Sequence, residues 1–538
     1  MKGFLSTRVV VAFSFAASLL VCLVTSAHSM GPAARASSEP SVGGLTPDEY
    51  LDQQRQLHEW LISELPDGTL DVPIRIPLTK QDRQTIANDT TPFPRPLRVG
   101  IVKRVGRSVK LWRGGPIAKA ATRLTHGVIR GTSDGGFAWA VALDSDGASA
   151  LRVHLSGVSL PGTAEIYFFT LDGQAHGPYR GKDAFWSNSV MGSQGIVLVR
   201  QFGPPATGGR PMSISVSSVG NIGEQFAAPQ NELCSYNAEC IENAEPHTGQ
   251  PVSDLKAATA YMEWTQGAFI YSCTGGLLAD SDPGSQIPYF LTANHCLKSN
   301  STAANLELFW NYTTSNGSCD GPGTPMTMGA TVKATGVKGD FTLLELNQAP
   351  PAGSVFMGWN SAEIATTSGV SLHRVSHPSG APQSYATHDT DSTFPTCGGL
   401  PLPQFIYSLD TFGSTEGGSS GSLVANDAGE VVGQLYGGCG SNQDECFSTA
   451  WRTVDGAFSY YYDDVAVFLG PGPPATPTPT PSATPTPTPT PEPGVILQLV
   501  AGGAGLVFLN NRRKRRTDLA RRELPPTAAN IRGCLFPL

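Results

Sequence analysis

Charged residues are scarce in this sequence. Asp, Glu, Lys and Arg make up 15% of its 538 residues, and the formal net charge is −8 at pH 7. A nucleic-acid-binding protein needs a basic face, which this balance does not supply, so we expect no nucleic-acid partner. No CxxC pair occurs among the ten cysteines, which makes zinc the weaker interpretation of them. We expect neither a metal nor an organic cofactor.

The N-terminus has the pattern of an export signal. Lys2 and Arg8 precede an apolar run over Val9–Val24, and small residues follow as far as Ala27. This pattern predicts a secretory signal peptide within residues 1–29. A retained membrane anchor is the alternative, although the run is short for a membrane span.

Eight of the ten cysteines lie between Cys234 and Cys446. An even set clustered in one block of an exported protein indicates a disulfide framework.

Local patterns divide the rest of the chain. Thr46 as N-cap, followed by proline and two acids, predicts a helix to about Ser63. Short alternating runs with glycine turns predict a β-sandwich-like block at 98–219, within a region that we place at 30–228. The cysteine-containing part, 229–469, has the same short-strand character and the size of two packed six-stranded barrels. The fold class predicted is therefore all-β.

The C-terminal part begins with a spacer. Residues 470–493 are rich in Thr-Pro, which favours stiff, extended polyproline II. An apolar run and a cluster of arginines and lysine follow within 494–516, and the tail is 517–538. Apolar residues stopped by positive charge predict a short transmembrane-like segment. The pattern resembles the PEP-CTERM sorting signal of exported bacterial proteins, which implies sorting machinery as a partner and a secreted or cell-surface location. A plain membrane anchor is the alternative.

One glycine-rich turn could present a nucleophile. In Thr415-Glu416-Gly417-Gly418-Ser419-Ser420-Gly421-Ser422, a serine flanked by glycines can lie where backbone N–H groups converge on an oxyanion. Glycine-serine turns are common, so the motif has value only together with a base.

Two further segments supply the base and its partner. An apolar strand ends in Ala293-Asn294-His295-Cys296, and imidazole is the side chain suited to general-base work near pH 7. A disulfide at Cys296 could clamp that turn. Asp340 opens an alternating strand, where a buried carboxylate can orient imidazole. The chain order His295, Asp340, Ser420 is the order found in chymotrypsin-type enzymes.

A rival interpretation centres on Ser419. The turn also satisfies G-x-S-x-G about that residue, as in α/β-hydrolases, which need a histidine after the serine. No histidine follows His388, so the rival is nearly excluded.

Five segments together resemble the bacterial lysyl endopeptidases, a family of trypsin-like serine proteases. They are Leu-Thr-Ala-Asn-His-Cys, Phe-Trp-Asn-Tyr, Asp-Phe-Thr-Leu-Leu-Glu-Leu, Thr-Glu-Gly-Gly-Ser-Ser-Gly-Ser and Gly-Gln-Leu-Tyr-Gly-Gly, within about residues 232–460. The resemblance implies a double-barrel endopeptidase with peptide or protein substrates. It assigns Ser420 as nucleophile, His295 as base and Asp340 as its orienter, with the N–H groups of Gly418 and Ser420 as the oxyanion hole.

The resemblance also implies disulfides Cys273–Cys296, Cys240–Cys319 and Cys234–Cys439. Cys397 and Cys446 are left, and we expect them to pair with each other, without support from the family.

Substrate preference is less well marked. By the resemblance, a buried aspartate pairs with the substrate's lysine, and Asp444 is the best candidate, with Glu445 as the alternative. Tyr436 stands where the family has histidine, and no tryptophan occurs between Cys397 and Phe412. These departures bear on lysine preference and not on the hydrolytic chemistry.

The resemblance implies that the region 30–228 is a pro-region removed on maturation, and a permanent surface-binding module is the alternative. For the whole protein we expect a secreted, monomeric serine endopeptidase. An inert adhesion protein that keeps the fold is the alternative, and esterase activity of the same triad stays open.

Overall fold

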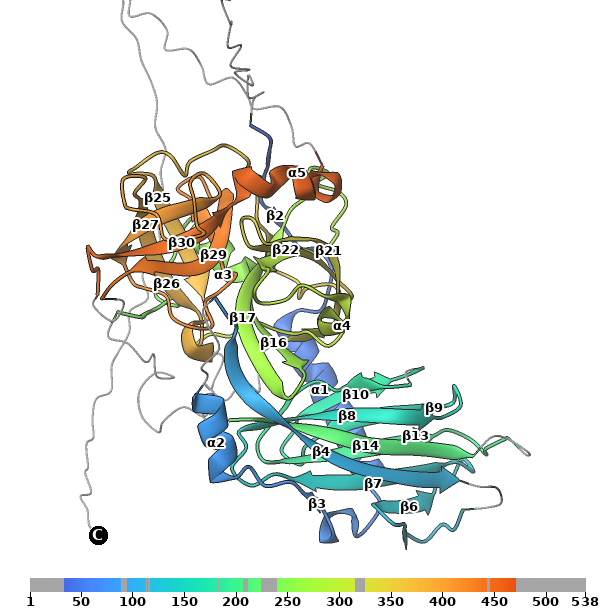
Figure 1. Cartoon of the computed structure of the whole chain (residues 1–538). Coiled ribbons are helices and arrows are strands. Elements are labelled where there is room, and N and C mark those ends of the chain that lie inside the picture. The colour runs from blue at the N-terminus through green and yellow to red at the C-terminus, as the bar shows by residue number, and fades with distance from the viewer. Residues whose placement is uncertain are drawn as a thin grey trace, which may run out of the picture. The chain divides into compact units, whose positions relative to one another are not determined.

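The computed structural model describes residues 33–470, apart from 89–93, 113, 115–116, 182, 207–210, 224–239, 315–324 and 443–445 (Figure 1). The predicted signal peptide, the Thr/Pro-rich linker beyond Gly470, the transmembrane-like segment and the tail lie outside the described residues. Within the part of the chain that is described, no helix is both long enough and apolar enough to cross a membrane.

The N-terminal elements include the predicted helix. Thr46 caps α1, and a capping box joins the Thr46 hydroxyl to the Glu49 N–H and the Glu49 carboxylate to the Thr46 N–H. The helix stops just before Pro66, as expected for a residue that disfavours helix at the preceding position. The elements here are β1 (Arg35–Ala36), β2 (Glu39–Pro40), α1 (Pro47–Glu64), η1 (Thr69–Asp71), β3 (Ile74–Arg75) and α2 (Lys80–Ala87).

Two sheets build the predicted β-sandwich-like block between Leu97 and Ile222. One has the order β10-β9-β13-β7-β6-β5, and the other contains β11-β8-β14-β4, with β12 also on β8. The strands are β4 (Leu97–Trp112), β5 (Thr122–Arg123), β6 (Val128–Gly131), β7 (Phe137–Asp144), β8 (Ala150–Ser159), β9 (Ala164–Phe169), β10 (Ala175–Tyr179), β11 (Phe185–Trp186), β12 (Val190–Met191), β13 (Gln194–Gln201) and β14 (Met212–Ile222).

Strand β7 explains how this block is layered. Phe137, Trp139 and Val141 join the core between the two sheets, whereas Ala140 and Ala142 face a second cluster that includes Leu61 of α1. Alternate residues of a strand point to opposite faces, so both faces of β7 are covered. From Phe137 to Leu143 the strand is therefore apolar throughout, without alternation.

The first barrel follows in the chain. Its strands pair in the order β20-β19-β16-β17-β18-β22-β21, and Gly329 alone separates β20 from β21. The nearly continuous stretch from β20 to β21 therefore pairs with β19 through β20 and with β22 through β21. The elements are β15 (Glu242–Asn243), α3 (Val252–Ala258), β16 (Thr259–Gln266), β17 (Phe269–Leu278), β18 (Tyr289–Ala293), α4 (Asn300–Ala303), β19 (Glu307–Trp310), β20 (Met326–Met328), β21 (Ala330–Gly336) and β22 (Phe341–Leu346).

The second barrel is closed. Its strands pair in the ring β29-β28-β25-β26-β27-β30, because β30 also pairs with β29. The elements are β23 (Val355–Phe356), β24 (Trp359–Asn360), β25 (Ser371–Ser376), η2 (Pro378–Gly380), β26 (Ser384–Thr390), β27 (Phe405–Phe412), β28 (Leu423–Asn426), β29 (Val431–Gly440), β30 (Trp451–Ala457) and α5 (Phe458–Leu469). The all-β fold with two barrels and a preceding sandwich-like block, predicted from the sequence, is confirmed.

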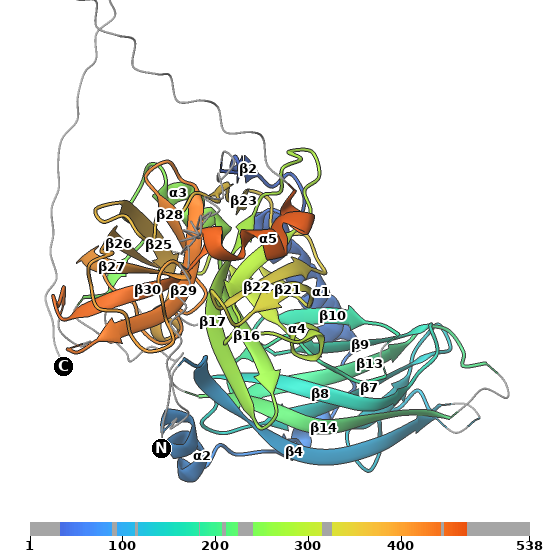
Figure 2. The same cartoon turned by 45° about the horizontal axis from the view of Figure 1, so that its top comes forward.

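Strand β4 joins the block to the first barrel. Gly100 and Ile101 pair with β14 on one edge and with β17 on the other, and Figures 1 and 2 both show β4 running beside β17. Closer to the N-terminus, β1 pairs with β24, and β2 pairs with β23. The barrels thus pair both with segments that precede the sandwich-like block and with the block's own first strand.

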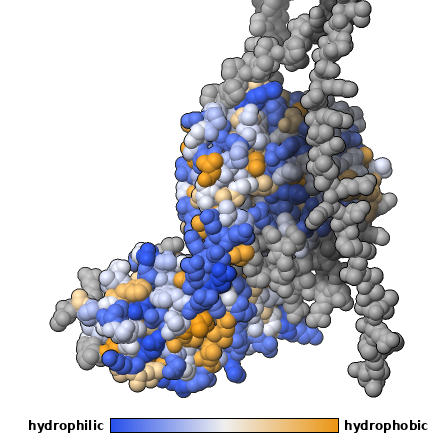
Figure 3. Space-filling view, turned by 180° about the vertical axis from the view of Figure 1, so that it is seen from behind, coloured by the Kyte–Doolittle hydropathy of each residue, from blue (hydrophilic) through white to orange (hydrophobic). Residues whose placement is uncertain are grey.

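The surface carries few large exposed hydrophobic residues. On the face shown in Figure 3, hydrophobic residues stand in small groups among hydrophilic ones. The most exposed examples in the described chain are Val42, Val337 and Val467. They are far apart in sequence, and single exposed hydrophobic residues of this kind are ordinary.

Candidate active site

His295 lies in the turn that follows β18. The next residue, Cys296, forms a disulfide with Cys273 of β17, with 6.2 Å between their Cα atoms. This confirms the predicted pair, and it fixes the turn against the neighbouring strand. A nitrogen of the His295 ring lies within 4.8 Å of both sulfurs, but sulfurs joined in a disulfide offer no thiolate to a metal.

Strand pairing brings Asp340 to His295. Ala293 at the end of β18 pairs with Phe341 at the start of β22, so the residues just beyond these ends meet. The backbone N–H of His295 donates to Asp340 Oδ1 at 3.0 Å, and His295 Nδ1 lies 2.6 Å from Asp340 Oδ2. A carboxylate only accepts, so Nδ1 carries the proton of this bond.

The backbone of Asp340 is strained. Its φ is +50°, in the left-handed region that few residues other than glycine adopt, and Gly339 before it has φ +74°. The Gln434 amide donates to the carbonyls of Gly339 and Asp340 at 2.8 and 3.1 Å. These bonds hold the strained turn, and with it the direction of the carboxylate.

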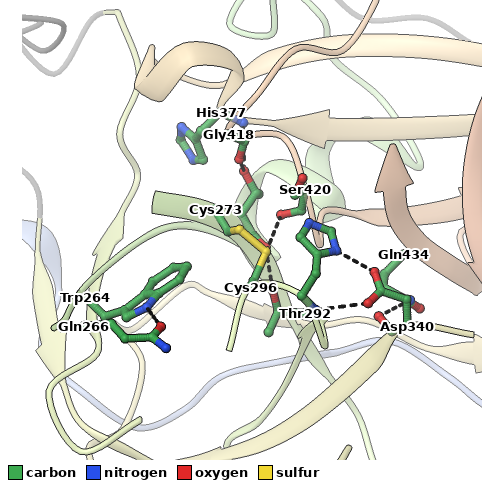
Figure 4. The surroundings of a disulfide bond; sticks show 12 residues. Trp264, Gln266, Cys273, Thr292, Cys296, Asp340, His377, Gly418, Ser420 and Gln434 are labelled. Atoms are coloured by element: carbon green, nitrogen blue, oxygen red, sulfur yellow. Dashed lines mark hydrogen bonds and ion pairs between the residues drawn. A yellow bond between two sulfur atoms is a disulfide. The ribbon is translucent and has the colours of Figure 1, made fainter. Parts of the chain in front are cut away.

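Ser420 lies in the predicted turn and is buried. Its carbonyl accepts from the Thr274 N–H at 2.9 Å, and the Cys296 sulfur lies 3.7 Å from the same oxygen. Figure 4 shows Ser420 beside the Cys273–Cys296 disulfide, with Asp340 and Gln434 further along. The turn that carries Ser420 therefore packs against the residue next to His295.

Glycines on either side allow this turn to form. Gly418 has φ +100°, and Gly421 has φ +82°. A Cβ on Gly421 would lie 2.2 Å from the Thr292 hydroxyl, so no larger residue fits. The Gly418 carbonyl accepts from the Thr274 hydroxyl at 2.8 Å, which turns it inward. Among the hydrogen bonds of the described residues, none uses the N–H of Gly418 or Ser420.

Ser419 points elsewhere. It is completely buried, and its hydroxyl accepts from the Ser376 hydroxyl at 3.0 Å. That contact places the Ser419 side chain among interior residues of the second barrel. The geometry thus separates the two adjacent serines, which the G-x-S-x-G pattern alone could not do.

Buried charged residues form hydrogen bonds with both ends of the turn that carries Ser420. At one end the Ser414 hydroxyl donates to Asp410 at 3.1 Å. At the other, Arg374 Nη1 donates to the carbonyl and the hydroxyl of Ser422, each at 3.0 Å. Asp410 and Arg374 are joined through His388, whose Nδ1 lies 2.8 Å from Asp410 and whose Nε2 accepts from Arg374 at 3.3 Å. We call Arg374, His388, Asp410 and Asp455 the buried charge cluster.

The cluster has a defined charge pattern. Arg374 also pairs with Asp455, and both are fully buried. Burial opposes ionisation of Asp410, but hydrogen bonds from His388, Thr453 and Ser414 outweigh it and hold its pKa below its ordinary value. Both ring nitrogens of His388 are used within the cluster, one toward Asp410 and the other toward Arg374.

Tyr436 of β29 stands beside His295. The two rings meet edge to face with centroids 6.0 Å apart. Burial, followed by the charge of Asp340, raises the pKa of Tyr436 to about 12. Nearby, the Trp451 ring lies against Gly438, where a Cβ would be only 1.8 Å from it. Asp444 and Glu445, the candidates for pairing with a substrate lysine, lie outside the described residues.

Three disulfide predictions are wrong. Cys240 pairs with Cys446, with 5.5 Å between their Cα atoms, and not with Cys319. Cys397 pairs with Cys439, at 6.0 Å, so neither Cys234–Cys439 nor Cys397–Cys446 forms. Strand β30 pairs with both β27 and β29, which brings the loop before β27 close to Cys439. Cys234 and Cys319 lie outside the described residues.

Sequence reasoning missed the residues that support the candidate site. Arg374, Thr274 and Gln434 each hold a backbone group of the site from a different strand. The one available signal was Arg374, a cation between Leu372 and Val375 in a short strand. Such a residue is seldom buried unless it is paired.

Known proteins resemble the barrel part of the chain. The family model described as lysyl endopeptidase, C-terminal domain, matches residues 229–450. A lysyl endopeptidase from Pseudomonas aeruginosa is 30% identical over 256 residues, a match that covers 44% of this chain and 52% of that protein. The chain thus spans about half the length of this curated relative.

Solved structures show weaker likeness. The HtrA-type protease AlgW, solved with a tripeptide, matches with a TM-score of 0.30 and 15% identity, over 41% of this chain and 62% of that one. The Rv3671c protein from M. tuberculosis H37Rv, in an inactive form, matches with a TM-score of 0.27 and 13% identity, over 42% and 95%. With TM-scores this low, neither structure contributes to the functional assignment.

Proposed function

We propose that the chain is an exported serine endopeptidase that cleaves peptide bonds through an acyl-enzyme formed on Ser420. The observation that carries the proposal is the pair His295–Asp340, bonded through two separate hydrogen bonds beside the turn that presents Ser420. An imidazole held by a carboxylate at Nδ1 is the kind of base that activates a hydroxyl nucleophile. The likeness to lysyl endopeptidases supports the same chemistry.

The steps follow from the geometry. His295 Nε2 takes the proton of the Ser420 hydroxyl as its oxygen attacks the scissile carbonyl, and Asp340 stabilises the imidazolium. The N–H groups of Gly418 and Ser420 bind the oxyanion. The imidazolium then gives its proton to the leaving amine. Water, deprotonated by His295, attacks the ester, and Ser420 regains its proton as the acid product leaves.

We infer a preference for a basic side chain on the acyl side of the cleaved bond, with Asp444 as the residue that pairs with it. An isolated cation in a desolvated pocket is costly, so such a preference requires a buried carboxylate. Tyr436, beside His295, is proposed to line the same pocket.

The proposal extends to processing. Residues 1–29 are assigned to export, 30–228 to a pro-region removed on maturation, 229–469 to the protease and 494–516 to a surface-sorting signal. Peptide and protein chains are the proposed substrates, and the mature enzyme is proposed to act as a monomer.

A peptide library tests the assignment. Purified protein is compared with Ser420→Ala, with Ser419→Ala as the matched control and with Asp444→Asn. We expect cuts after Lys or Arg that are lost in Ser420→Ala, kept in Ser419→Ala and reduced in Asp444→Asn. Peptidase activity that persists in Ser420→Ala refutes the nucleophile. No cleavage from correctly disulfide-bonded wild type favours the inert binding protein.

A further inference from the structure

Strand β17 pairs with β16 along one edge, and its other edge contacts β4, Ser420 and β18 in succession. Phe269–Ser272 pair with β4, and Gly276–Leu278 pair with β18. Between them, the Thr274 N–H donates to the Ser420 carbonyl. Residues two apart in a strand direct their backbone groups to the same edge. Along this edge of β17, the first residue of β4, Leu97, therefore comes just before the segment that carries Ser420.

The register between β4 and β17 shows how close the chain before β4 comes to Ser420. Leu97, the first residue of β4, pairs with Ser272. The strands are antiparallel, so the chain before Leu97 advances toward Cys273 and Thr274. The observed pairing stops at Leu97; continued by two residues at the usual rise of a strand, about 6–7 Å, the same register would bring Arg95 level with Thr274, the residue that bonds Ser420.

A side-chain contact supports this approach. The Leu97 Cδ1 atom lies 3.6 Å from where a Cβ on Gly417 would stand. Gly417 opens the turn Gly417-Gly418-Ser419-Ser420. Leu97 and Arg95 are both partly buried. Arg98 is fixed by its stacking over Phe269, at 3.9 Å, and by its bond to the Thr85 carbonyl at 2.9 Å.

The chain that leads into Leu97 runs in a direction that a bound substrate could take across the proposed nucleophile. Residue numbers rise away from Ser420, so Leu97 and Arg98 lie on the leaving-amine side of any bond that reaches the nucleophile. The bond that the register brings there is Arg95–Pro96, with a basic residue on its acyl side. Proline gives a tertiary amide without an N–H, and its ring fixes φ.

We propose that Pro94–Arg98 is a built-in pseudosubstrate, which occupies the leaving-group side of the cleft and presents Arg95 to the specificity pocket, while Pro96 protects the bond. This inference rests on the proposed function. Because the segment is tethered, its effective concentration is in the millimolar range, and a modest intrinsic affinity is enough to close the cleft. Leu97 is the second residue after the Arg95–Pro96 bond. By the same register, we expect substrates to fit the cleft when the second residue after their cleaved bond is aliphatic.

Self-cleavage of the full chain tests the protection. In Pro96→Ala, we expect mass spectrometry to find new chain ends at Arg95 and Ala at position 96. These ends should be absent from wild type and from the double variant Pro96→Ala/Ser420→Ala. An active full chain that leaves this bond intact in Pro96→Ala overturns the inference, while the proposed function stands.

Turnover of a small peptide substrate tests the occupancy. Leu97→Ala in the full chain removes a contact of about 1.4 kcal/mol, so turnover should rise about tenfold. Arg104→Ala, an exposed position on the same strand, is the matched control and should leave turnover unchanged. Equal turnover in Leu97→Ala and wild type refutes the pseudosubstrate. A chain that cleaves nothing in any variant, Leu97→Ala included, refutes the proposed function instead.

Discussion

The two barrels bury their charges in different places. The interior of the first barrel is apolar, with Phe290, Leu291 and Leu343 among its residues. Besides Asp280 and Asp340, the buried charges of its described residues lie on the side facing the sandwich-like block. There Glu263 and Glu307 meet Arg152 and Ser189 of the block. The second barrel holds the buried charge cluster within its own ring of strands. The first barrel thus has buried charges whose partners belong to a neighbour, and the second has buried charges that anchor the turn carrying Ser420.

The difference assigns separate tasks to the barrels. The first supplies His295 and Asp340 at its rim through one strand pairing, so their geometry depends on β18 and β22. The second supplies Ser420 on a turn anchored at Ser414 and Ser422. The proposed mechanism needs such fixed partners, because an attacking oxygen must be placed to within about half an ångström.

We expect the largest loss of activity from a substitution at Asp340, at the rim of the first barrel. Asp340→Asn keeps the shape but leaves an amide that can donate to Nδ1, which favours the wrong tautomer of His295. We expect kcat to fall about ten-thousand-fold with little change in KM, measured on a peptide substrate. A loss of less than tenfold would remove Asp340 from the proposed mechanism.

Breaking the buried charge cluster should cost stability. Arg374→Met leaves Asp455 buried without its cation and frees Ser422, so we expect the free energy of unfolding to fall by about 3–5 kcal/mol in urea titrations. The double variant Arg374→Met/Asp455→Asn should recover part of the loss, because the second carboxylate is then uncharged. If the single variant is as stable as wild type, the cluster does not anchor the turn.

The buried charges of the first barrel should instead make the stability of the protein depend on pH. Burial, and then the charge of Glu307, raise the pKa of Glu263 to about 8 although Arg152 opposes this. The folded state therefore keeps a proton that the unfolded chain releases above about pH 4.5. This contribution to stability is complete below that pH and is lost as the pH rises through 8.

Urea titrations at pH 5 and pH 9 check this, in a Ser420→Ala background that prevents self-cleavage. Glu263→Gln should lose less stability between the two pH values than its parent does. Identical losses would show that the block does not hold Glu263 in its protonated form.

The smallest effect is expected at Tyr436. Tyr436→Phe keeps the edge-to-face contact with His295 and removes only the hydroxyl, so kcat should change by less than about threefold. Tyr436→Ala also loses the ring contact, worth about 0.5–1.5 kcal/mol, and should be the slower of the two. A loss above a hundredfold in Tyr436→Phe would give the hydroxyl a direct part in the reaction.

The sequence predicted what local patterns determine. The helix at Pro47–Glu64 has its cap and proline in adjacent positions, and the residues His295, Asp340 and Ser420 each stand at a strand end or a glycine turn. Pairings through space were harder. Cys439 reaches Cys397 only because β30 joins β27 to β29, and Arg374 and Asp410 meet only through His388, across strands that no sequence spacing relates.

Covalent labelling tests the central claim most directly. Full-length wild type and Leu97→Ala, the latter to open the cleft, are treated with a fluorophosphonate and mapped by peptide mass spectrometry. We expect one adduct, on Ser420, that is more abundant in Leu97→Ala and is lost when His295→Ala is added. An adduct on Ser419, or no adduct on Ser420 in folded Leu97→Ala protein, would contradict it.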